Sequence, residues 1–262
     1  MRFLGLQEKY QTSPPLWCTA GMQIEITTGL LMILVGLSTV VVAKWIWQIP
    51  FQWFCCGALL WAIAVVAKVF IAGLTLDSVL GELQNHLPKP MYLALGSGYI
   101  GLLTGITEPV ATLAAGSIWR QLTYDARRAL GIGLGAGAVE AIYFGTLAIV
   151  ASAEMYGSQA GFGTSVLAPV IERLILIPCH AAVRAMTLYA IATGRWSWFW
   201  GGFAILSVMD SIAGFYHLTD GKTNLWLIEF SFLPFAVLSV ALLRYLWRHW
   251  PPPASARASR GR

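Results

Sequence analysis

Seven apolar runs, each about as long as a lipid bilayer is thick, follow one another along this chain of 262 residues. They cover residues 24–43, 51–76, 91–117, 129–152, 165–192, 197–217 and 224–246. A helix needs about 20 mostly apolar residues to cross the hydrocarbon core, where every backbone group must find a partner within the protein. The pattern therefore predicts an all-α, polytopic membrane helical bundle with about seven transmembrane helices, in contact with the lipid bilayer.

The charge content excludes several other classes of protein. Only 11% of the residues are Asp, Glu, Lys or Arg, whereas soluble domains contain about 25%. So few charges cannot solvate the surface of a soluble particle of this length. The same composition, with 57% hydrophobic residues, excludes a disulfide-rich secreted module and a nucleic-acid-binding domain. The net charge of +5 therefore needs an explanation that involves the membrane and no nucleic acid.

The segments between the apolar runs are too short to fold as separate soluble domains. We divide the chain into an extramembrane lead-in at 1–22, a single transmembrane helical domain at 23–247 and a basic, proline-rich cytoplasmic tail at 248–262. Loops are expected between the runs, the longest of them at 77–90. The absence of an internal sequence repeat argues against transporters built from duplicated halves.

Basic residues outside the apolar runs predict the orientation, because cytoplasmic loops collect Lys and Arg. One side of the membrane would carry four of them, namely Arg2, Lys9, Lys89 and Lys222. The other side would carry ten, namely Lys44, Arg120, Arg127, Arg128, Arg195, Arg244, Arg248, Arg257, Arg260 and Arg262. We therefore expect the N-terminus outside and the C-terminus in the cytoplasm.

Ten ionisable residues fall inside the apolar runs, where a charge is costly unless it faces the bundle interior or water. Three of them, Glu25, Arg184 and Glu229, are expected to reach the headgroups from near the ends of their runs. Lys68 is deeper and is expected to pair with a carboxylate. The remaining six are functional candidates and concentrate in the third to sixth runs: Glu108, Glu140, Glu172, Arg173, His180 and Asp210.

Two of the carboxylates stand beside backbone features. Glu108 precedes Pro109, which removes a backbone donor and kinks a helix next to the carboxylate. Glu140 follows glycines at 131, 133, 135 and 137, whose i and i+4 pairs allow a neighbouring helix to approach closely. Close packing alone explains the glycines, but it does not explain a carboxylate at the end of them.

The other candidates fall on shared helix faces. Arg173 and His180 are seven residues apart, nearly two turns, and Arg184 extends their face by another turn. Asp210 and His217 have the same spacing in the sixth run. A buried glutamate beside a histidine, with an arginine nearby, is what general acid–base hydrolysis requires, and the histidine could also hold a metal. The same residues could instead form a closed structural network, and spacing alone leaves both alternatives open.

At these positions the sequence resembles the YhfC family of intramembrane metalloproteases. The family's glycine-rich glutamate helix is similar to Gly131-Ile-Gly-Leu-Gly-Ala-Gly-Ala-Val-Glu140-Ala-Ile. Its Glu-Arg pair, followed by a histidine a little over two turns later, is similar to Ile171-Glu172-Arg173-Leu-Ile-Leu-Ile-Pro-Cys-His180. A family aspartate matches Ala204-Ile-Leu-Ser-Val-Met-Asp210, and residues 101–109 stand where relatives carry paired glutamates. The similarity covers residues 99–213, nearly half of the chain.

The resemblance implies a peptidase of the bacterial plasma membrane that hydrolyses membrane-associated peptides or transmembrane-helix substrates. It implies a helical core shared with PrsW, the CAAX-processing proteases and the Aph subunit of gamma-secretase. Its catalytic set comprises Glu140 as the base together with His180, Asp210, Glu172, Arg173 and Glu108. It also implies a divalent metal such as zinc, with His180, Glu140 and Asp210 as ligands.

Three positions depart from the family pattern. Ala136 and Leu206 stand where relatives carry histidines, and the paired glutamates are reduced to Glu108 between Thr107 and Pro109. A metal site built on those two histidines would lack both of them. A mechanism without a metal, in which Glu140 activates water, needs neither.

Two further functions stay open beside the peptidase. One is a catalytically degenerate scaffold or chaperone of the same fold that binds partner helices in the same cavity. The other is a small proton-coupled transporter that uses the acidic residues as relays. A retinal photoreceptor is disfavoured because the seventh run contains no lysine. Convergence of Glu140, His180 and Asp210 on one water-accessible cavity would distinguish a site from separate buried charges.

Overall fold

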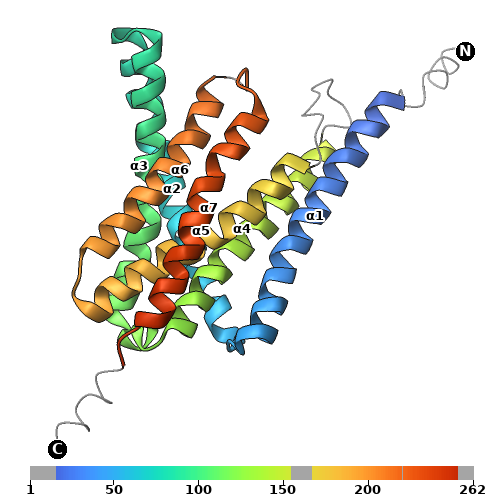
Figure 1. Ribbon diagram of the computed structural model, residues 1–262. Coiled ribbons are helices and arrows are strands. Elements are labelled where there is room, and N and C mark those ends of the chain that lie inside the picture. Colours follow the sequence, from blue (N-terminus) through green and yellow to red (C-terminus); the bar gives the residue numbers. More distant parts are fainter. Residues whose placement is uncertain (1–15, 155–166, 220, 253–262) are drawn as a thin grey trace, which may run out of the picture.

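The computed structural model describes residues 16–154, 167–219 and 221–252, and within them all regular structure is helical (Figure 1). The elements are α1 (Leu16–Trp47), α2 (Phe51–His86), α3 (Lys89–Ile118), the 3-10 turn η1 (Arg120–Thr123), α4 (Ala126–Glu154), α5 (Leu167–Thr193), α6 (Ser197–Leu218) and α7 (Leu225–His249). Six of these helices are long and apolar enough to cross a membrane. These helices confirm the prediction of an all-α, integral membrane protein, with six of the about seven expected spans identified. The helix outside this group of six is α3, whose glycines, threonines and Glu108 make it less apolar than the others.

Most helix bounds agree with the apolar runs, but the expected loop at 77–90 is wrong. α2 continues to His86, and only Leu87 and Pro88 separate it from α3. The segment from Asp77 to His86 is polar, yet its Leu, Glu and Gln residues are good helix formers. Hydropathy indicates which residues contact lipid, but it does not indicate where a helix ends. Within the expected lead-in at 1–22, the described residues 16–22 already belong to α1, whereas residues 1–15, and residues 253–262 of the expected tail, lie outside the described residues.

Successive helices run in opposite directions, so α1, α3, α5 and α7 begin at one end of the bundle and end at the other (Figure 1). We call these ends the N-terminal face and the C-terminal face. α5 is the central helix, in contact with α1, α3, α4, α6 and α7. It is also the most buried helix, with an unbroken buried stretch from Cys179 to Ala190. The polar side chains of α5 are thereby directed into the bundle rather than into lipid.

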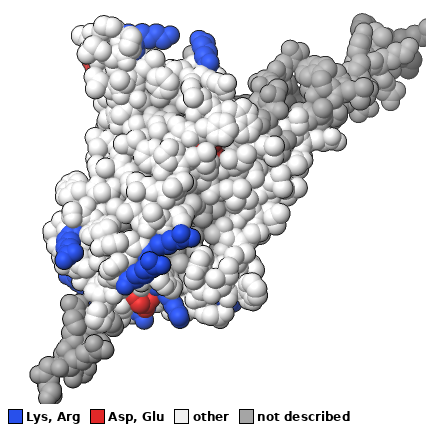
Figure 2. All heavy atoms as spheres, in the orientation of Figure 1, with Lys and Arg blue, Asp and Glu red and all other residues white. Residues whose placement is uncertain are grey.

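The surface between the two ends is apolar (Figure 2). Lys and Arg side chains gather near both ends of the face in view, and a broad belt that is almost entirely uncharged lies between them. Many large apolar side chains are exposed, and Val66, Phe70 and Val237 are each more than 65% exposed. Exposed apolar area on this scale is expected for a surface that contacts lipid. The belt therefore agrees with membrane integration.

Glycines hold α4 against two neighbours at backbone contact distance. A Cβ added at Gly133 would lie 2.4 Å from Cα of Ala181 in α5, and one added at Gly135 would lie 2.2 Å from the carbonyl oxygen of Phe54 in α2. Alternate glycines thus face different helices. The prediction that they permit close helix approach is confirmed, and this approach brings Glu140 to the centre of the bundle.

We expect Gly133→Ala to lower the free energy of unfolding by about 1–3 kcal/mol, the usual cost of overpacking a tight core. Gly73→Ala is the matched control, because Gly73 lies in α2 with nothing within 4 Å of the added Cβ. That change should be neutral or should stabilise the protein by up to about 1 kcal/mol. Unfolding of both variants in detergent measures the difference. Equal stability of the two variants would contradict the close approach of α4 and α5.

Candidate functional site

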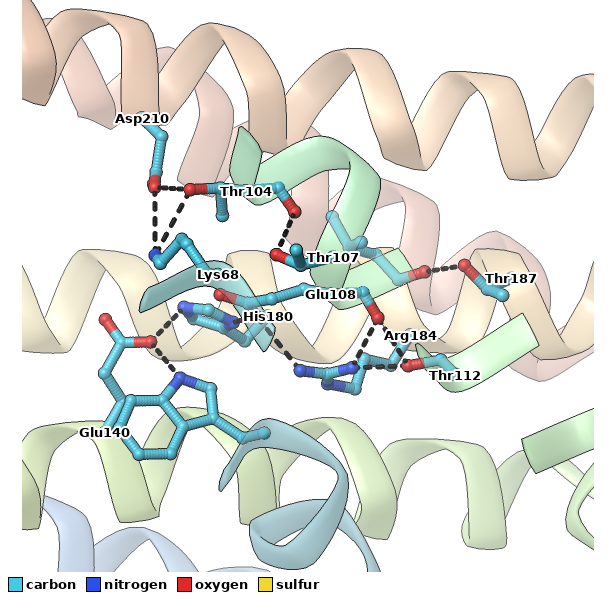
Figure 3. Close-up of polar contacts among 12 residues, drawn as sticks. Lys68, Thr104, Thr107, Glu108, Thr112, Glu140, His180, Arg184, Thr187 and Asp210 are labelled. Carbon is cyan, nitrogen blue, oxygen red and sulfur yellow. Dashed lines mark hydrogen bonds and ion pairs between the residues drawn. The ribbon is translucent and has the colours of Figure 1, made fainter. Parts of the chain in front are cut away.

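A histidine bridges two glutamates at the centre of the bundle (Figure 3). His180 of α5 places Nε2 2.8 Å from Oε2 of Glu140 in α4, and Nδ1 3.5 Å from Oε2 of Glu108 in α3. Glu108 is 3% exposed, Glu140 9% and His180 5%. When both ring nitrogens carry hydrogen, each can donate toward a carboxylate. Three residues that are far apart in the sequence therefore form one continuous polar chain, which we call the Glu–His–Glu centre.

Two arginines of α5 neutralise the two glutamates. Arg184 donates from Nη2 to Oε2 of Glu108 at 3.0 Å, and its Nη1 donates to the backbone carbonyl of the same residue at 3.1 Å. Arg173 donates to Oε1 of Glu140 and to Oε1 of Glu172, and its guanidinium lies 4.9 Å from the ring centre of Phe144. Buried charges are tolerated when they are paired and hydrogen-bonded in this way. Each glutamate of the centre thus has its own cation.

The two glutamates differ in how fully they are bonded. Both oxygens of Glu140 are bonded. Oε1 accepts from Arg173, and Oε2 accepts from Nε1 of Trp61 at 2.9 Å in addition to its contact with His180. Oε1 of Glu108, by contrast, accepts no hydrogen bond from the residues that the structure describes. Glu140 is therefore held in place from three sides. Glu108 keeps one oxygen available for a water molecule or a ligand.

A second polar cluster lies toward α6 (Figure 3). Nζ of Lys68 in α2 is 3.6 Å from Oδ2 of Asp210 in α6 and donates to Oγ1 of Thr104 in α3 at 3.2 Å. The hydroxyl of Thr104 in turn donates to Asp210. The side chains of Lys68 and Asp210 are each about one third exposed. This confirms the prediction that Lys68 pairs with a carboxylate.

Both clusters line one cavity of about 570 Å³, which we call the central cavity. Its walls are mostly apolar, with contributions from Met32, Val65, Leu147 and Phe232. Its ionisable lining residues are Lys68, Glu108, Glu140, Glu172, Arg173, His180, Asp210 and His217. An apolar pocket with a few convergent polar groups is the usual form of a ligand site. All six candidates named from the sequence face this one cavity.

Within the cavity, the candidates separate into two groups. Glu108, Glu140 and His180 form the centre, with Arg173 and Glu172 attached to Glu140. Asp210 instead bonds with Lys68 and Thr104. Glu108 thus takes the place beside His180 that the resemblance implied for Asp210. Sequence spacing could not decide this, because helix periodicity gives the face of each residue but not the helix that the face meets.

The expectation that Arg184 and Glu229 reach the headgroups is wrong. Arg184 is 1% exposed, stands more than two turns before the end of α5 at Thr193, and bonds across to α3. Glu229 is 3% exposed. Both residues turn inward because their helix faces meet other helices there rather than lipid. Glu25 is half-buried at the edge of a second cavity.

Three partners of the site residues escaped sequence reasoning. Trp61 bonds with Glu140, Thr104 with Asp210, and Thr112 accepts from Arg184. Only Trp61 carried a usable signal. It lies in the middle of an apolar run, far from the interfaces where membrane tryptophans usually gather, and a buried indole N–H needs a partner.

The three residues of the centre could hold a metal ion. One ligand atom each from Glu108, Glu140 and His180 lie within 4.8 Å of one another. One imidazole and two carboxylates are ligand types that zinc accepts in catalytic sites. The donor set therefore fits a divalent ion, although the same two carboxylates already accept from Arg173 and Arg184. A bound ion would share each carboxylate with a guanidinium.

No protein-family model, curated protein or solved structure matches this chain. The resemblance to the YhfC family stays a prediction. The cavity itself offers a carboxylate with a free oxygen, a histidine in contact with it, and a second carboxylate that fixes the histidine ring.

Proposed function

We propose that the central cavity hydrolyses an amide bond of a membrane-associated peptide, with the Glu–His–Glu centre as its acid–base unit. The observation that carries the proposal is the placement of His180 between two buried glutamates, one fully bonded and one with a free oxygen, on the wall of a cavity of about 570 Å³. The apolar walls suit the side chains of a membrane peptide.

In this reaction Glu108 is the base and His180 is the acid. As the water oxygen bonds to the carbonyl carbon, the free Oε1 of Glu108 takes a proton from that water. When the carbon–nitrogen bond breaks, His180 gives the leaving nitrogen the proton of Nδ1, whose 3.5 Å contact with Glu108 is longer than the 2.8 Å contact of Nε2 with Glu140. The proton on Glu108 then passes to His180 across their 3.5 Å contact, which restores both groups. The products are a carboxylic acid and an amine, so that one water is consumed and no proton is lost.

Glu140 acts here as a positioning residue. Its two oxygens are bonded to Trp61, Arg173 and His180, and this fixes the imidazole plane toward Glu108. The role differs from the base expected from the resemblance, because a carboxylate with both oxygens bonded is poorly placed to take a proton from water. If a divalent metal binds, Glu108, Glu140 and His180 would hold it, and it would supply a polarised water and carbonyl group.

Turnover of a transmembrane peptide tests the proposal. The purified protein in detergent is incubated with a fluorogenic peptide of about 20 apolar residues, and products are identified by mass spectrometry. A membrane fraction without the protein, taken through the same purification, is the control for contaminating proteases. Hydrolysis that survives a strong chelator supports the metal-free unit, and hydrolysis lost to the chelator and restored by zinc supports the metal. Binding without any cleavage would replace the peptidase with the scaffold hypothesis.

The same bridge favours one second candidate, a proton relay in a small transporter. A carboxylate–imidazole–carboxylate chain can pass a proton along its length. Liposomes that contain the protein and a pH-sensitive dye would report such transfer. Proton flux without peptide cleavage would favour the relay, whereas cleavage without flux would exclude it as the main activity.

We further propose that all seven helices cross the bacterial plasma membrane, with the N-terminus outside, and that the chain is a divergent member of the YhfC group. Lys44, Arg120 and Arg195 stand at the ends of helices that finish at the C-terminal face, whereas few basic residues stand at the other face. Green fluorescent protein fused after Trp250 should therefore fluoresce, and alkaline phosphatase fused there should be inactive. The reverse pattern would invert the orientation.

A further inference from the structure

A second cavity opens beside the first at the N-terminal face of the bundle. It measures about 300 Å³, and we call it the outer cavity. It lies where α5 and α7 begin and α6 ends, since Pro169, Leu225 and His217 line it. α1 closes its remaining side with Glu25 and Thr28.

The lining of the outer cavity is mainly acidic, with one histidine, His217. Glu25, Glu172 and Glu229 line it, and among the described residues no Lys or Arg does. Arg173, which follows Glu172 in the chain, is already bonded to Glu172 and Glu140. Glu25 and Glu229 therefore lack a guanidinium or ammonium partner within the part of the chain that the structure describes. The cavity thus offers carboxylate oxygens without a matching Lys or Arg to any ligand that enters it.

Glu229 points independently to a ligand of this cavity. Its side chain lines the outer cavity and is 3% exposed, and its Oε2 has no hydrogen-bond partner in the described part of the chain. An ionised carboxylate that is buried without a partner is strongly unfavourable. The other carboxylates that line the two cavities deep in the bundle each have a cation, namely Glu108, Glu140, Glu172 and Asp210. A cationic ligand would complete the same pattern at Glu229.

The arrangement suits an ammonium group better than a metal ion. Among the described residues, only the Glu–His–Glu centre brings three possible metal ligands within 4.8 Å of one another. The carboxylates of the outer cavity do not form such a group. A metal needs its ligands about 2 Å from the ion, on all sides. An ammonium group donates three hydrogen bonds at longer range and accepts a wider spacing of its acceptors.

The two cavities are adjacent and share part of their walls. Pro169, Glu172, Ala213, His217 and Phe232 line both of them. Glu172 and His180 lie on the same helix, separated by about 12 Å along its axis. About three or four extended residues of a peptide would cover that distance. A peptide held by its ammonium group in the outer cavity would thus place a nearby amide bond at the Glu–His–Glu centre.

We propose that the outer cavity binds the primary ammonium group of the peptide substrate, with Glu229 as its main acceptor and Glu25 and Glu172 in support. The proposal rests on the proposed peptidase function for the identity of the ligand. Its physical basis, an acidic cavity with one unpartnered buried carboxylate, is separate from the catalytic centre.

Three synthetic peptides of identical apolar sequence test the proposal. The first has a free N-terminal amine and no lysine, the second is N-acetylated, and the third is N-acetylated with one lysine near that end. Binding to the full chain is measured by fluorescence in phosphatidylcholine nanodiscs, whose lipid carries no primary ammonium group. We expect the second peptide to bind about ten- to hundredfold more weakly than the first or the third. The ratio of the affinities of the first and third peptides then shows whether the bound ammonium group is the α-amine or the lysine side chain.

Glu229→Gln should remove this preference, and Glu82→Gln is its matched control, because Glu82 is exposed in α2 and ion-paired only with His86 among the described residues. Equal binding of all three peptides would overturn the proposal. So would tighter binding of phosphatidylethanolamine than of the first peptide, which would assign the cavity to lipid. If the preference holds but no peptide is cleaved, the ammonium site stands and the proposed hydrolysis fails. If cleavage occurs with equal rates for all three peptides, the hydrolysis stands and the ammonium site fails.

Discussion

Replacement of Arg184 by methionine will lower the free energy of unfolding by about 3–5 kcal/mol, the usual cost of removing one partner from a buried ion pair. Arg184 is 1% exposed and holds three groups of α3, namely the carboxylate of Glu108, its backbone carbonyl and the hydroxyl of Thr112. Methionine is nearly as long but offers no donor. Glu108 would then remain charged in the core with only His180 as its partner.

Two further variants isolate the cause of this loss. Arg248→Met removes an exposed arginine from α7 and should change the unfolding free energy by less than about 0.5 kcal/mol. The double variant Arg184→Met/Glu108→Gln removes both charges and should recover a large part of the stability, because no unpaired charge then remains buried. Unfolding of the purified proteins in detergent measures all three. A double variant less stable than Arg184→Met would show that packing, and not the unpaired carboxylate, sets the cost.

The sequence was sufficient for the helices and for the list of candidate residues. Lipid imposes long apolar runs, so hydropathy located each of the seven α-helices. It missed the first turns of α1, which begins at Leu16, and the polar end of α2, where the helix continues beyond the apolar run. The glycines at 133 and 135 also predicted close packing, since backbone contact requires the absence of a Cβ. Both inferences depend on local sequence.

The pairing of the site residues could not be predicted in the same way. Arg184 and Glu108 are 76 residues apart, and Trp61 and Glu140 are 79 apart. Helix phase states which residues share a face, but it does not state which helix that face meets. For this reason the sequence alone directs Arg184 to the headgroups although its helix is the most enclosed of the bundle, and it favours Asp210 beside His180 where Glu108 stands.

Glu229 shows a similar limit and a way around it. Its position near the start of α7 favours a headgroup contact by sequence alone, yet the helix face that carries it turns toward α5 and α6. An acidic residue near a helix start is ordinary. An acidic residue there that is buried without a partner indicates a ligand. Only the three-dimensional arrangement distinguishes this case from an ordinary acidic residue at a helix start.

Glu108→Gln and His180→Ala should each lower kcat/KM for the peptide by about 10²- to 10⁴-fold, the range for loss of a general acid or base. The glutamine amide of the first variant cannot take a proton from water, and the alanine methyl group of the second cannot give one to the leaving nitrogen. Glu82→Gln is the control for substitution of a glutamate outside the cavity and should leave kcat/KM unchanged. Each rate is divided by the folded fraction of the same preparation, because Glu108→Gln also removes the ionised partner of Arg184.

The double variant Glu108→Gln/His180→Ala distinguishes a unit from two independent groups. If the proton passes between Glu108 and His180 in each turnover, the loss of either group stops the same cycle, and the second substitution should reduce the rate little further. Independent roles would instead multiply the two losses, to about 10⁴-fold or more. Multiplied losses would separate the two residues in the reaction and leave their 3.5 Å contact as a structural one. A rate equal to that of the single variants would assign the proton transfer to this contact, which links α3 to α5 through the central cavity.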